Sequence, residues 1–230
     1  MLVRLVAVAS FLLVAPIVAS SRPVVVELFT SEGCSSCPPA DAFLSELSRD
    51  RPELLPLAFH VTYWNSLGWQ DPYSLEAATQ RQAEYSARFG DSPYTPEMVI
   101  DGQKGLVGSN RRAAEAAIAK AQKADEAEVA VSAVRHGRTI SVTVGRGAGH
   151  AQVVLVGYDA GHVTNVARGE NTGRTLRESN IVRSIQTVGE WTGAPLKLES
   201  ATPAGEQAAI LIQSTDGAII GAARVAGIGL

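Results

Sequence analysis

One run of residues constrains the fold of this chain most strongly, because an apolar segment, two cysteines and a helix-like segment follow each other directly. The segment VVVELFT, residues 24–30, is almost continuously apolar and rich in β-branched residues, which is typical of a strand covered on both faces. SEGCSSC follows as a turn, and PADAFLSELSRD then has the apolar spacing of a helix. We therefore expect Cys34 and Cys37 where a buried strand ends and a helix begins.

The first twenty residues look like a signal peptide. They contain one basic residue, Arg4, then an apolar run from Leu5 to Val18, then small residues. A membrane anchor is the alternative, but Pro16 interrupts the run, and about 20 apolar residues are needed to span a bilayer. Cleavage is favoured. We expect a secreted or periplasmic protein that has no membrane contact after the signal peptide has been removed.

The cysteine count favours a reactive pair over a structural staple. The chain has only two cysteines, and the loop between Cys34 and Cys37 contains two residues, so a bond there removes little entropy from the unfolded chain. In an oxidising compartment such a bond can persist. At a helix N-terminus the macrodipole favours a thiolate. Cys34 is therefore the expected nucleophile and Cys37 the resolving thiol, and both are the expected catalytic residues.

Composition argues against several other classes of function. The net charge is −3 and charged residues make up 19% of the chain, so no basic excess points to a nucleic acid partner. Neither a phosphate-binding loop nor a Ser-His-Asp pattern stands out. We expect no cofactor, no metal and no nucleic acid, and the sequence does not indicate an oligomeric state.

The rest of the first half alternates between runs of strand length and segments of helical spacing. The expected elements are a strand at 54–64, a helix at 74–90, a strand at 98–100, a hairpin turn at Asp101–Gly102 and a helix at 111–126. Such alternation is typical of an α/β domain.

From about Glu128 the apolar residues recur with a period of two, and no amphipathic helix is evident. The sequence thus predicts an α/β N-terminal domain followed by an all-β, sandwich-like C-terminal domain. The expected boundaries are residues 1–20 for the signal peptide, 21–127 for the α/β domain and 128–230 for the β-rich domain.

The order of elements around CxxC-P and Thr95-Pro96 resembles the thioredoxin fold. More specifically, VVELFTSEGCSSCPPAD, HVTYWNSLGWQDPYS, YTPEMVIDG and RGENTGRTLRESNIVRS resemble an exported thioredoxin-like family catalogued as a domain of unknown function. The resemblance implies a thioredoxin-like N-terminal domain. It also implies a cis bond before Pro96, which would face the dithiol, and a substrate chain bound at the backbone of Thr95.

The resemblance implies a thiol–disulfide oxidoreductase that acts on a protein partner, with a protein thiol or disulfide as its substrate. One departure stands out, because the tryptophan that usually precedes the first cysteine in thioredoxins is replaced by Glu32-Gly33. A general disulfide reductase is therefore not implied, and neither the direction of the reaction nor the physiological substrate follows.

Trp64, Trp69, Asp71 and Tyr73 crowd one loop at the end of the second expected strand. Trp64 and Trp69 either wall a groove beside the thiols, where they would bind substrate, or fill and cover the core. The sequence leaves both interpretations open.

His60 provides the main alternative function. With both thiols it would complete a metal site, and the protein would bind copper or a partner without turnover. However, Met98 is the only methionine after the signal peptide, so soft ligands for copper are few. A hydrogen-bonded histidine in the core or at its rim is favoured.

A polar stretch at residues 167–184 interrupts the β-rich half. Its charged residues Arg168, Glu170, Arg174 and Arg177 either bind an anion or bridge the two halves of the chain through ion pairs. Bridging is favoured.

Overall fold

The computed structural model describes residues 22–123 and 129–227. The expected signal peptide and the expected boundary at 127–128 lie outside the described residues. The first half contains β1 (Val24–Thr30), α1 (Pro38–Asp50), β2 (Leu54–His60), the 3-10 helix η1 (Tyr63–Leu67), α2 (Glu76–Phe89), β3 (Glu97–Ile100), β4 (Lys104–Val107) and α3 (Arg111–Ala121). The second half contains β5 (Val131–His136), β6 (Thr139–Val144), β7 (Ala151–Asn165), β8 (Thr175–Trp191), β9 (Leu196–Ala201), β10 (Gln207–Ser214), β11 (Ile219–Arg224) and β12 (Ala226–Gly227).

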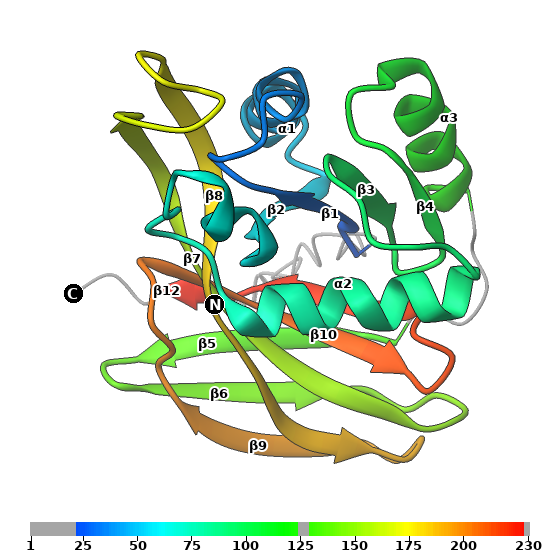
Figure 1. Ribbon diagram of the computed structural model, residues 1–230. Coiled ribbons are helices and arrows are strands. Elements are labelled where there is room, and N and C mark those ends of the chain that lie inside the picture. The colour runs from blue at the N-terminus through cyan, green and yellow to red at the C-terminus, as the bar shows by residue number, and fades with distance from the viewer. Residues whose placement is uncertain (1–21, 124–128, 228–230) are drawn as a thin grey trace, which may run out of the picture.

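The strands form two mixed sheets (Figure 1). The larger sheet has eight strands in the order β11-β10-β7-β8-β2-β1-β3-β4, and the smaller has four in the order β12-β5-β6-β9. In the larger sheet β2 runs parallel to both β1 and β8, and the other pairs are antiparallel. Ala58 of β2 is paired with Ile181 of β8, so one sheet takes four strands from each half of the chain.

The expected fold class, an α/β thioredoxin-like domain followed by an all-β sandwich-like domain, is wrong. The protein is mostly β, with few helices, and its larger sheet crosses from one half of the chain to the other. The physical reason is the edge of β2. An open edge presents unpaired backbone groups, and β8 covers this one. The pairing joins segments far apart in the sequence, so local periodicity does not reveal it.

Three groups of buried apolar side chains hold the layers together. On one side of β1 and β3 lie α1 and α3, and on the other lies α2 (Figure 1). The core under α2 contains residues of both halves, for example Phe29 and Phe59 together with Val156 and Leu211. A third core lies between the smaller sheet and strands β7 and β10.

Local signals in the sequence explain where the helices begin and end. Pro38 and Pro39 occupy the first positions of α1, where a missing amide costs little. Asn110 accepts a bond from the Ala113 amide and caps α3. Gly90 ends α2 with a φ of 73°, in the left-handed region that favours glycine.

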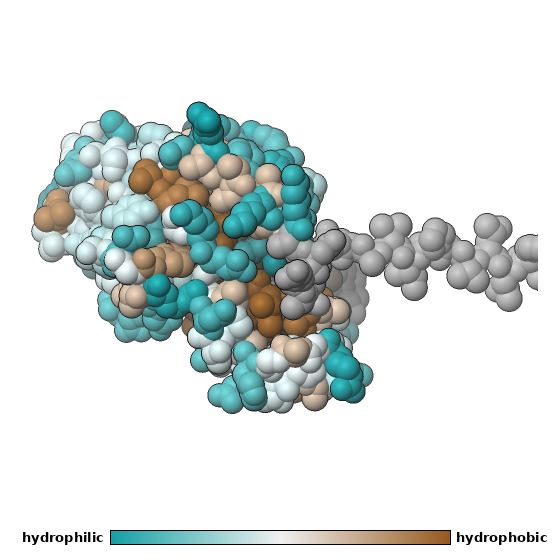
Figure 2. Space-filling model, turned by 90° about the vertical axis from the view of Figure 1, so that its right-hand side faces the viewer, coloured by the Kyte–Doolittle hydropathy of each residue, from teal (hydrophilic) through white to brown (hydrophobic). Residues whose placement is uncertain are grey.

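The surface carries no large apolar face in the view of Figure 2, where apolar residues form separate patches among hydrophilic ones. Within the described ranges, every helix is too short or too polar to cross a membrane.

Candidate functional site

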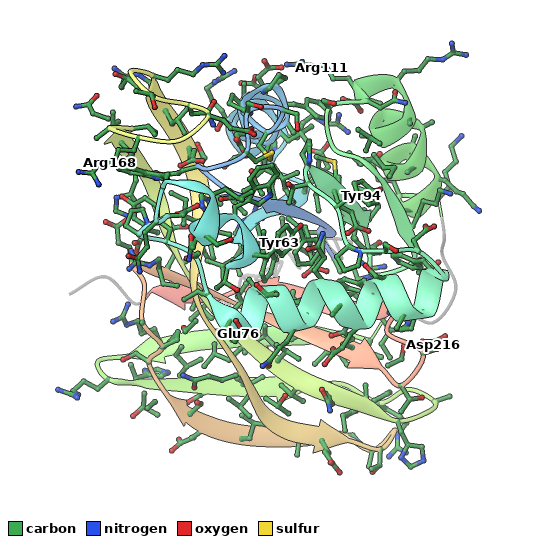
Figure 3. All side chains as sticks on the ribbon, in the orientation of Figure 1. Tyr63, Glu76, Tyr94, Arg111, Arg168 and Asp216 are labelled. Carbon is green, nitrogen blue, oxygen red and sulfur yellow. A yellow bond between two sulfur atoms is a disulfide. The ribbon has the colours of Figure 1, made fainter. Side chains whose placement is uncertain are left out.

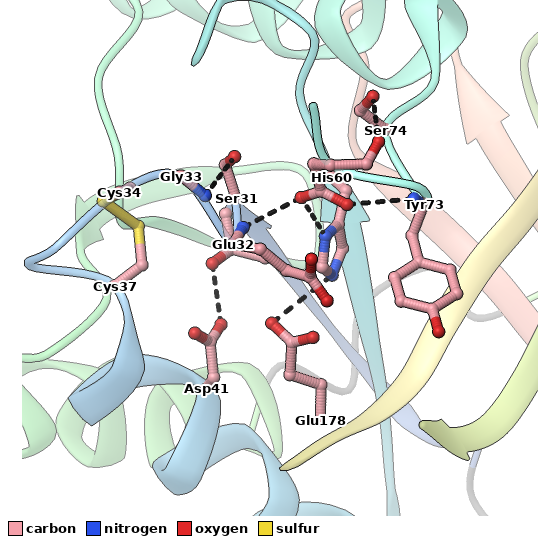
Figure 4. Close-up of polar contacts among 12 residues, drawn as sticks. Ser31, Glu32, Gly33, Cys34, Cys37, Asp41, His60, Tyr73, Ser74 and Glu178 are labelled. Atoms are coloured by element: carbon pink, nitrogen blue, oxygen red, sulfur yellow. Dashed lines mark hydrogen bonds and ion pairs between the residues drawn. A yellow bond between two sulfur atoms is a disulfide. The ribbon is translucent and has the colours of Figure 1, made fainter. Parts of the chain in front are cut away.

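Cys34 and Cys37 form a disulfide where the chain leaves β1 and enters α1 (Figure 4). Their Cα atoms are 5.4 Å apart, and both residues are fully buried. The turn is closed by bonds from the Cys34 amide to the Ser31 carbonyl and from the Cys37 amide to the Cys34 carbonyl. The predicted position of the pair, between a buried strand and a helix, is confirmed.

Thr95 and Pro96 are connected to this turn through Trp64. The Thr95–Pro96 peptide bond is cis, as the resemblance implies. The indole of Trp64 donates a hydrogen bond to Thr95 Oγ1 at 2.7 Å. Trp64 also packs against Gly33, where an added Cβ would lie 3.3 Å from the Trp64 Cβ. Thr95, Trp64 and the residue before Cys34 are therefore contiguous.

Trp69 lies between the CxxC turn and the end of the β7–β8 hairpin. Its indole donates to Glu32 Oε2 at 2.8 Å, and its Cβ would be 3.1 Å from a Cβ added at Gly169. It also lines an open cavity of about 470 Å³ together with Arg168. Trp64 and Trp69 are both half-buried beside the disulfide. Trp64 thus contacts the CxxC turn at Gly33, and Trp69 contacts it at Glu32.

Behind the turn, His60 lies at the centre of a group of buried acids (Figure 4). Its Nδ1 is 2.7 Å from Asp71 Oδ2, and its Nε2 is 3.8 Å from Glu178 Oε1. Burial opposes the charged ring, but the carboxylates of Asp71 and Glu178 outweigh it and raise the pKa of His60 to about 10. His60 is a hydrogen-bonded core histidine, as the favoured interpretation predicts.

The acids of this group respond to burial in different ways. Burial raises the pKa of Glu178 to about 8, and neither of its carboxylate oxygens has a hydrogen-bond partner among the described residues. Burial also raises the pKa of Asp41 to about 7, although Thr30 donates a bond of 2.7 Å to it. Asp71 is also buried, but His60 and the amides of Glu32 and Tyr73 hold its pKa below the usual range.

Glu32 completes the group. Burial raises the pKa of its carboxyl, which accepts the bond from Trp69 through one oxygen only. Near neutral pH, protons on His60 and Glu178 therefore offset much of the negative charge behind the disulfide.

Asp41 and Glu178 were not predicted from the sequence. Asp41 follows Cys37 by one helical turn and shares the buried side of α1 with Leu44. A carboxylate among apolar positions of a helix is a usable signal. Glu178 gives no such signal, because only the pairing of β8 with β2 buries it.

The polar stretch does connect the two halves, but not through Arg168, Arg174 or Arg177; Arg183, near its end, lies over the ring of Tyr73 in the first half at 5.3 Å. Arg168, Arg174 and Arg177 are exposed, and among the described residues they form no ion pair (Figure 3 shows Arg168 at the outer edge). Glu170 and Asn171 contact the CxxC turn instead.

The metal interpretation finds no geometric support. In the part of the chain that the structure describes, no group of three or more His, Cys, Asp or Glu side chains is placed to hold a metal ion. His60 points its two nitrogens at carboxylates, and the two cysteines are bonded to each other.

Known proteins similar to this chain share its fold across both halves. A crystal structure of a structural genomics target from Agrobacterium tumefaciens is 30% identical, with a TM-score of 0.77, and the match covers 91% of this chain and 97% of that one. HBP35 of Porphyromonas gingivalis is 14% identical, with a TM-score of 0.62, over 91% of this chain and 78% of that one, and shares the fold.

No match is found among curated proteins. One family model, described as "Protein of unknown function (DUF1223)", matches residues 25–213 and so spans strands of both halves. The chain therefore belongs to this uncharacterised family, whose member here has a CxxC disulfide at the start of its first helix.

Proposed function

We propose that the protein exchanges its Cys34–Cys37 disulfide with the thiols or disulfides of a protein partner. The observation that carries the proposal is the disulfide itself. It closes a loop of two residues, which adds little stability. It also lies at the N-terminus of α1, beside the buried carboxyl groups of Asp41 and Glu178, whose pKa values burial raises toward neutral pH. The proposal rests on the disulfide and the residues around it, and it does not depend on a thioredoxin-like fold. It also includes export to an oxidising compartment, where such a bond persists.

Exchange with a partner disulfide balances as follows. The Cys34 thiolate attacks one partner sulfur, the partner S–S bond breaks, and the other partner sulfur leaves as a thiolate. Cys37 then loses its proton and attacks the Cys34 sulfur. The Cys34–Cys37 bond forms, and the partner leaves as a second thiolate that takes up a proton. The partner is reduced and the protein is oxidised, and the reverse sequence oxidises a partner dithiol.

A trapping experiment tests the proposal. In the Cys37→Ala variant the second attack is impossible, so mixed disulfides on Cys34 should accumulate in cells that export the full chain. Mass spectrometry of the periplasmic fraction should find adducts that a reductant releases. The Cys34→Ala/Cys37→Ala variant is the control and should give none. Absence of adducts, together with a wild-type disulfide that does not respond to glutathione buffers, would contradict the proposal.

Asp41 is the proposed acceptor of the Cys37 proton. It lies one turn further along α1, with its amide bonded to the Cys37 carbonyl at 3.1 Å, and it is buried beside the same turn. Its pKa, raised by burial to about 7, suits proton transfer near neutral pH.

We expect Asp41→Asn to slow the attack of Cys37 on a mixed disulfide by at least about tenfold, because general base catalysis of this kind contributes that much or more. The rate should also lose its dependence on pH near 7. The measurement is release of a chromogenic thiol from a preformed Cys34 adduct. Asp50→Asn, on the exposed end of the same helix, should leave rate and pH profile unchanged. An unchanged pH profile in Asp41→Asn would remove Asp41 from this role.

A further inference from the structure

The tip of the β7–β8 hairpin, residues 166–174, lies against the CxxC turn. The side-chain amide of Asn171 donates to the carbonyls of Glu32 at 2.8 Å and Cys34 at 3.0 Å. The amide of Ser35 donates to Glu170 Oε2 at 3.1 Å. Figure 1 shows the yellow tip beside the blue segment that leads into α1. Two side chains from the second half of the chain therefore bind three backbone groups around Cys34.

The tip has a defined shape of its own. The Gly173 amide bonds the Val166 carbonyl, and the Arg174 amide bonds the Asn171 carbonyl. Gly169 has a φ of 79° and lies in contact with Trp69. Asn171 is fully buried although its neighbours on both sides are exposed. The side-chain amide of Asn171 donates both of its hydrogens to the CxxC turn, whereas its Oδ1 has no partner among the described residues, so the turn provides all of the hydrogen bonding of this buried side chain.

The contact matters because neither sulfur is accessible. Cys34 and Cys37 both have no exposed surface, whereas thiol–disulfide exchange requires the attacking sulfur to reach one of the two. The turn must therefore open before any reaction. The hairpin tip is the part of the second half that is bonded to this turn, and a hairpin end can move without unfolding the sheets behind it.

We propose that Asn171 and Glu170 are positioning residues that hold the CxxC turn closed, so that release of the hairpin tip admits the thiol that attacks the disulfide. The partner that fits is an extended polypeptide, whose own amides can take over the carbonyls of Glu32 and Cys34 when Asn171 leaves them. Glu170 adds an electrostatic component. Its carboxylate occupies the Ser35 amide, a donor that would otherwise favour a thiolate at Cys34.

This inference deepens the proposed function, but its test needs no physiological partner. The probe is dithiothreitol, a small dithiol, and the measurement is the rate at which it reduces the full-length wild-type disulfide under native conditions. We expect Asn171→Ala to be reduced about tenfold faster or more, because each lost hydrogen bond shifts the opening equilibrium several-fold. Glu170→Gln, which keeps an acceptor but removes the charge, should change the rate less.

Asn180→Ala is the matched control. Asn180 of β8 is another buried asparagine, whose side-chain amide donates to the Pro56 carbonyl at 2.7 Å and to Ser48 Oγ at 3.0 Å, and no hydrogen bond joins it to the CxxC turn among the described residues. Urea unfolding of both variants shows how much global stability each has lost. If Asn171→Ala accelerates reduction beyond its loss of stability and Asn180→Ala does not, the tip holds the turn closed. Equal acceleration in both, or none in Asn171→Ala, would overturn the inference.

Gly169→Ala covers the case in which Asn171→Ala does not fold. The new Cβ would lie 3.1 Å from the Trp69 Cβ, and it would stand at a left-handed backbone position that favours glycine. We expect this substitution to displace the hairpin tip from the CxxC turn while Asn171 and the cysteines stay unchanged. Faster reduction supports the inference, and an unchanged rate opposes it. Trapped adducts on Cys34 without any effect of these variants would leave the proposed function intact and reject the role of the tip.

Discussion

The free energy of unfolding of the oxidised protein is expected to be highest in mildly acidic solution and to fall as the pH rises through about 10. Three buried groups act in the same direction. The folded protein raises the pKa of His60 from 6.5 to about 10, of Glu178 from 4.5 to about 8, and of Asp41 from 3.8 to about 7. In each case the folded state holds a proton that the unfolded chain has released, so stability is lost as pH rises between the two values.

The size of the effect follows from the same shifts. One pKa unit corresponds to about 1.4 kcal/mol, so a rise of about three pKa units in a single group corresponds to roughly 4 kcal/mol. The three groups are coupled and their contributions do not add in full, so a total loss of at least about 4 kcal/mol is expected between about pH 5 and about pH 10. Asp71 acts in the opposite direction, because its pKa is held below the usual value, and it weakens the fold only as the solution becomes strongly acidic. Many domains have a broad stability maximum between about pH 5 and 8, and a steady decline across that range would mark the acid group.

Urea unfolding at a series of pH values measures this profile. Glu178→Gln should make the decline between about pH 5 and pH 8 clearly shallower, because the amide cannot release a proton and fills nearly the same volume, while Asp41 and His60 account for the decline that remains. Glu190→Gln, an exposed glutamate on the same strand, should leave the profile unchanged. A wild-type profile that is flat or rises over this range would mean that the acids behind the disulfide are already relieved of their charge in another way.

Much of the local structure was predicted from the sequence, because its causes are local, although β2 ends at His60 and a 3-10 helix begins at Tyr63 within the strand expected at 54–64. The run at residues 24–30 is matched by β1 residue for residue, and the expected turn at Asp101–Gly102 joins β3 to β4. The helix signals at Pro38 and Asn110 are met at the starts of α1 and α3. Periodicity and caps act over a few residues, so they can be read without knowing the rest of the fold.

The arrangement of the halves could not be predicted in this way. Whether β8 pairs with β2 depends on which strand edges are still unpaired elsewhere in the fold. The residue pattern within either strand does not show which edge its partner will be. The same step decides much of the site. Glu178 and Asn180 lie on β8 and become buried beside β2, and Asn171 reaches the CxxC turn because the hairpin continues past it. The cysteines, Trp64 and Trp69 were found from the sequence, whereas the parts of the site that depend on β8 and the hairpin were not.

The largest single loss of stability is expected from Arg81→Met. Arg81 of α2 is buried, and its guanidinium donates to Glu27 of β1 at 2.6 Å and to Gln213 of β10 at 2.9 Å. Tyr85 joins the group by donating to the second oxygen of Glu27 at 2.5 Å. Removing the guanidinium leaves the buried Glu27 without its counter-charge, which should cost about 3–5 kcal/mol. Chemical denaturation of the oxidised protein measures the loss.

The double variant Glu27→Gln/Arg81→Met separates the charge from the packing. With no charge left in the core, it should recover at least half of the stability that Arg81→Met loses, since much of the penalty belongs to the unpaired carboxylate. If the double variant is as weak as the single one, the hydrogen bonds to Gln213 and Tyr85 carry the stability instead. Because Gln213 lies in the second half and Glu27 in the first, either result measures how firmly one buried side chain holds the two halves in one sheet.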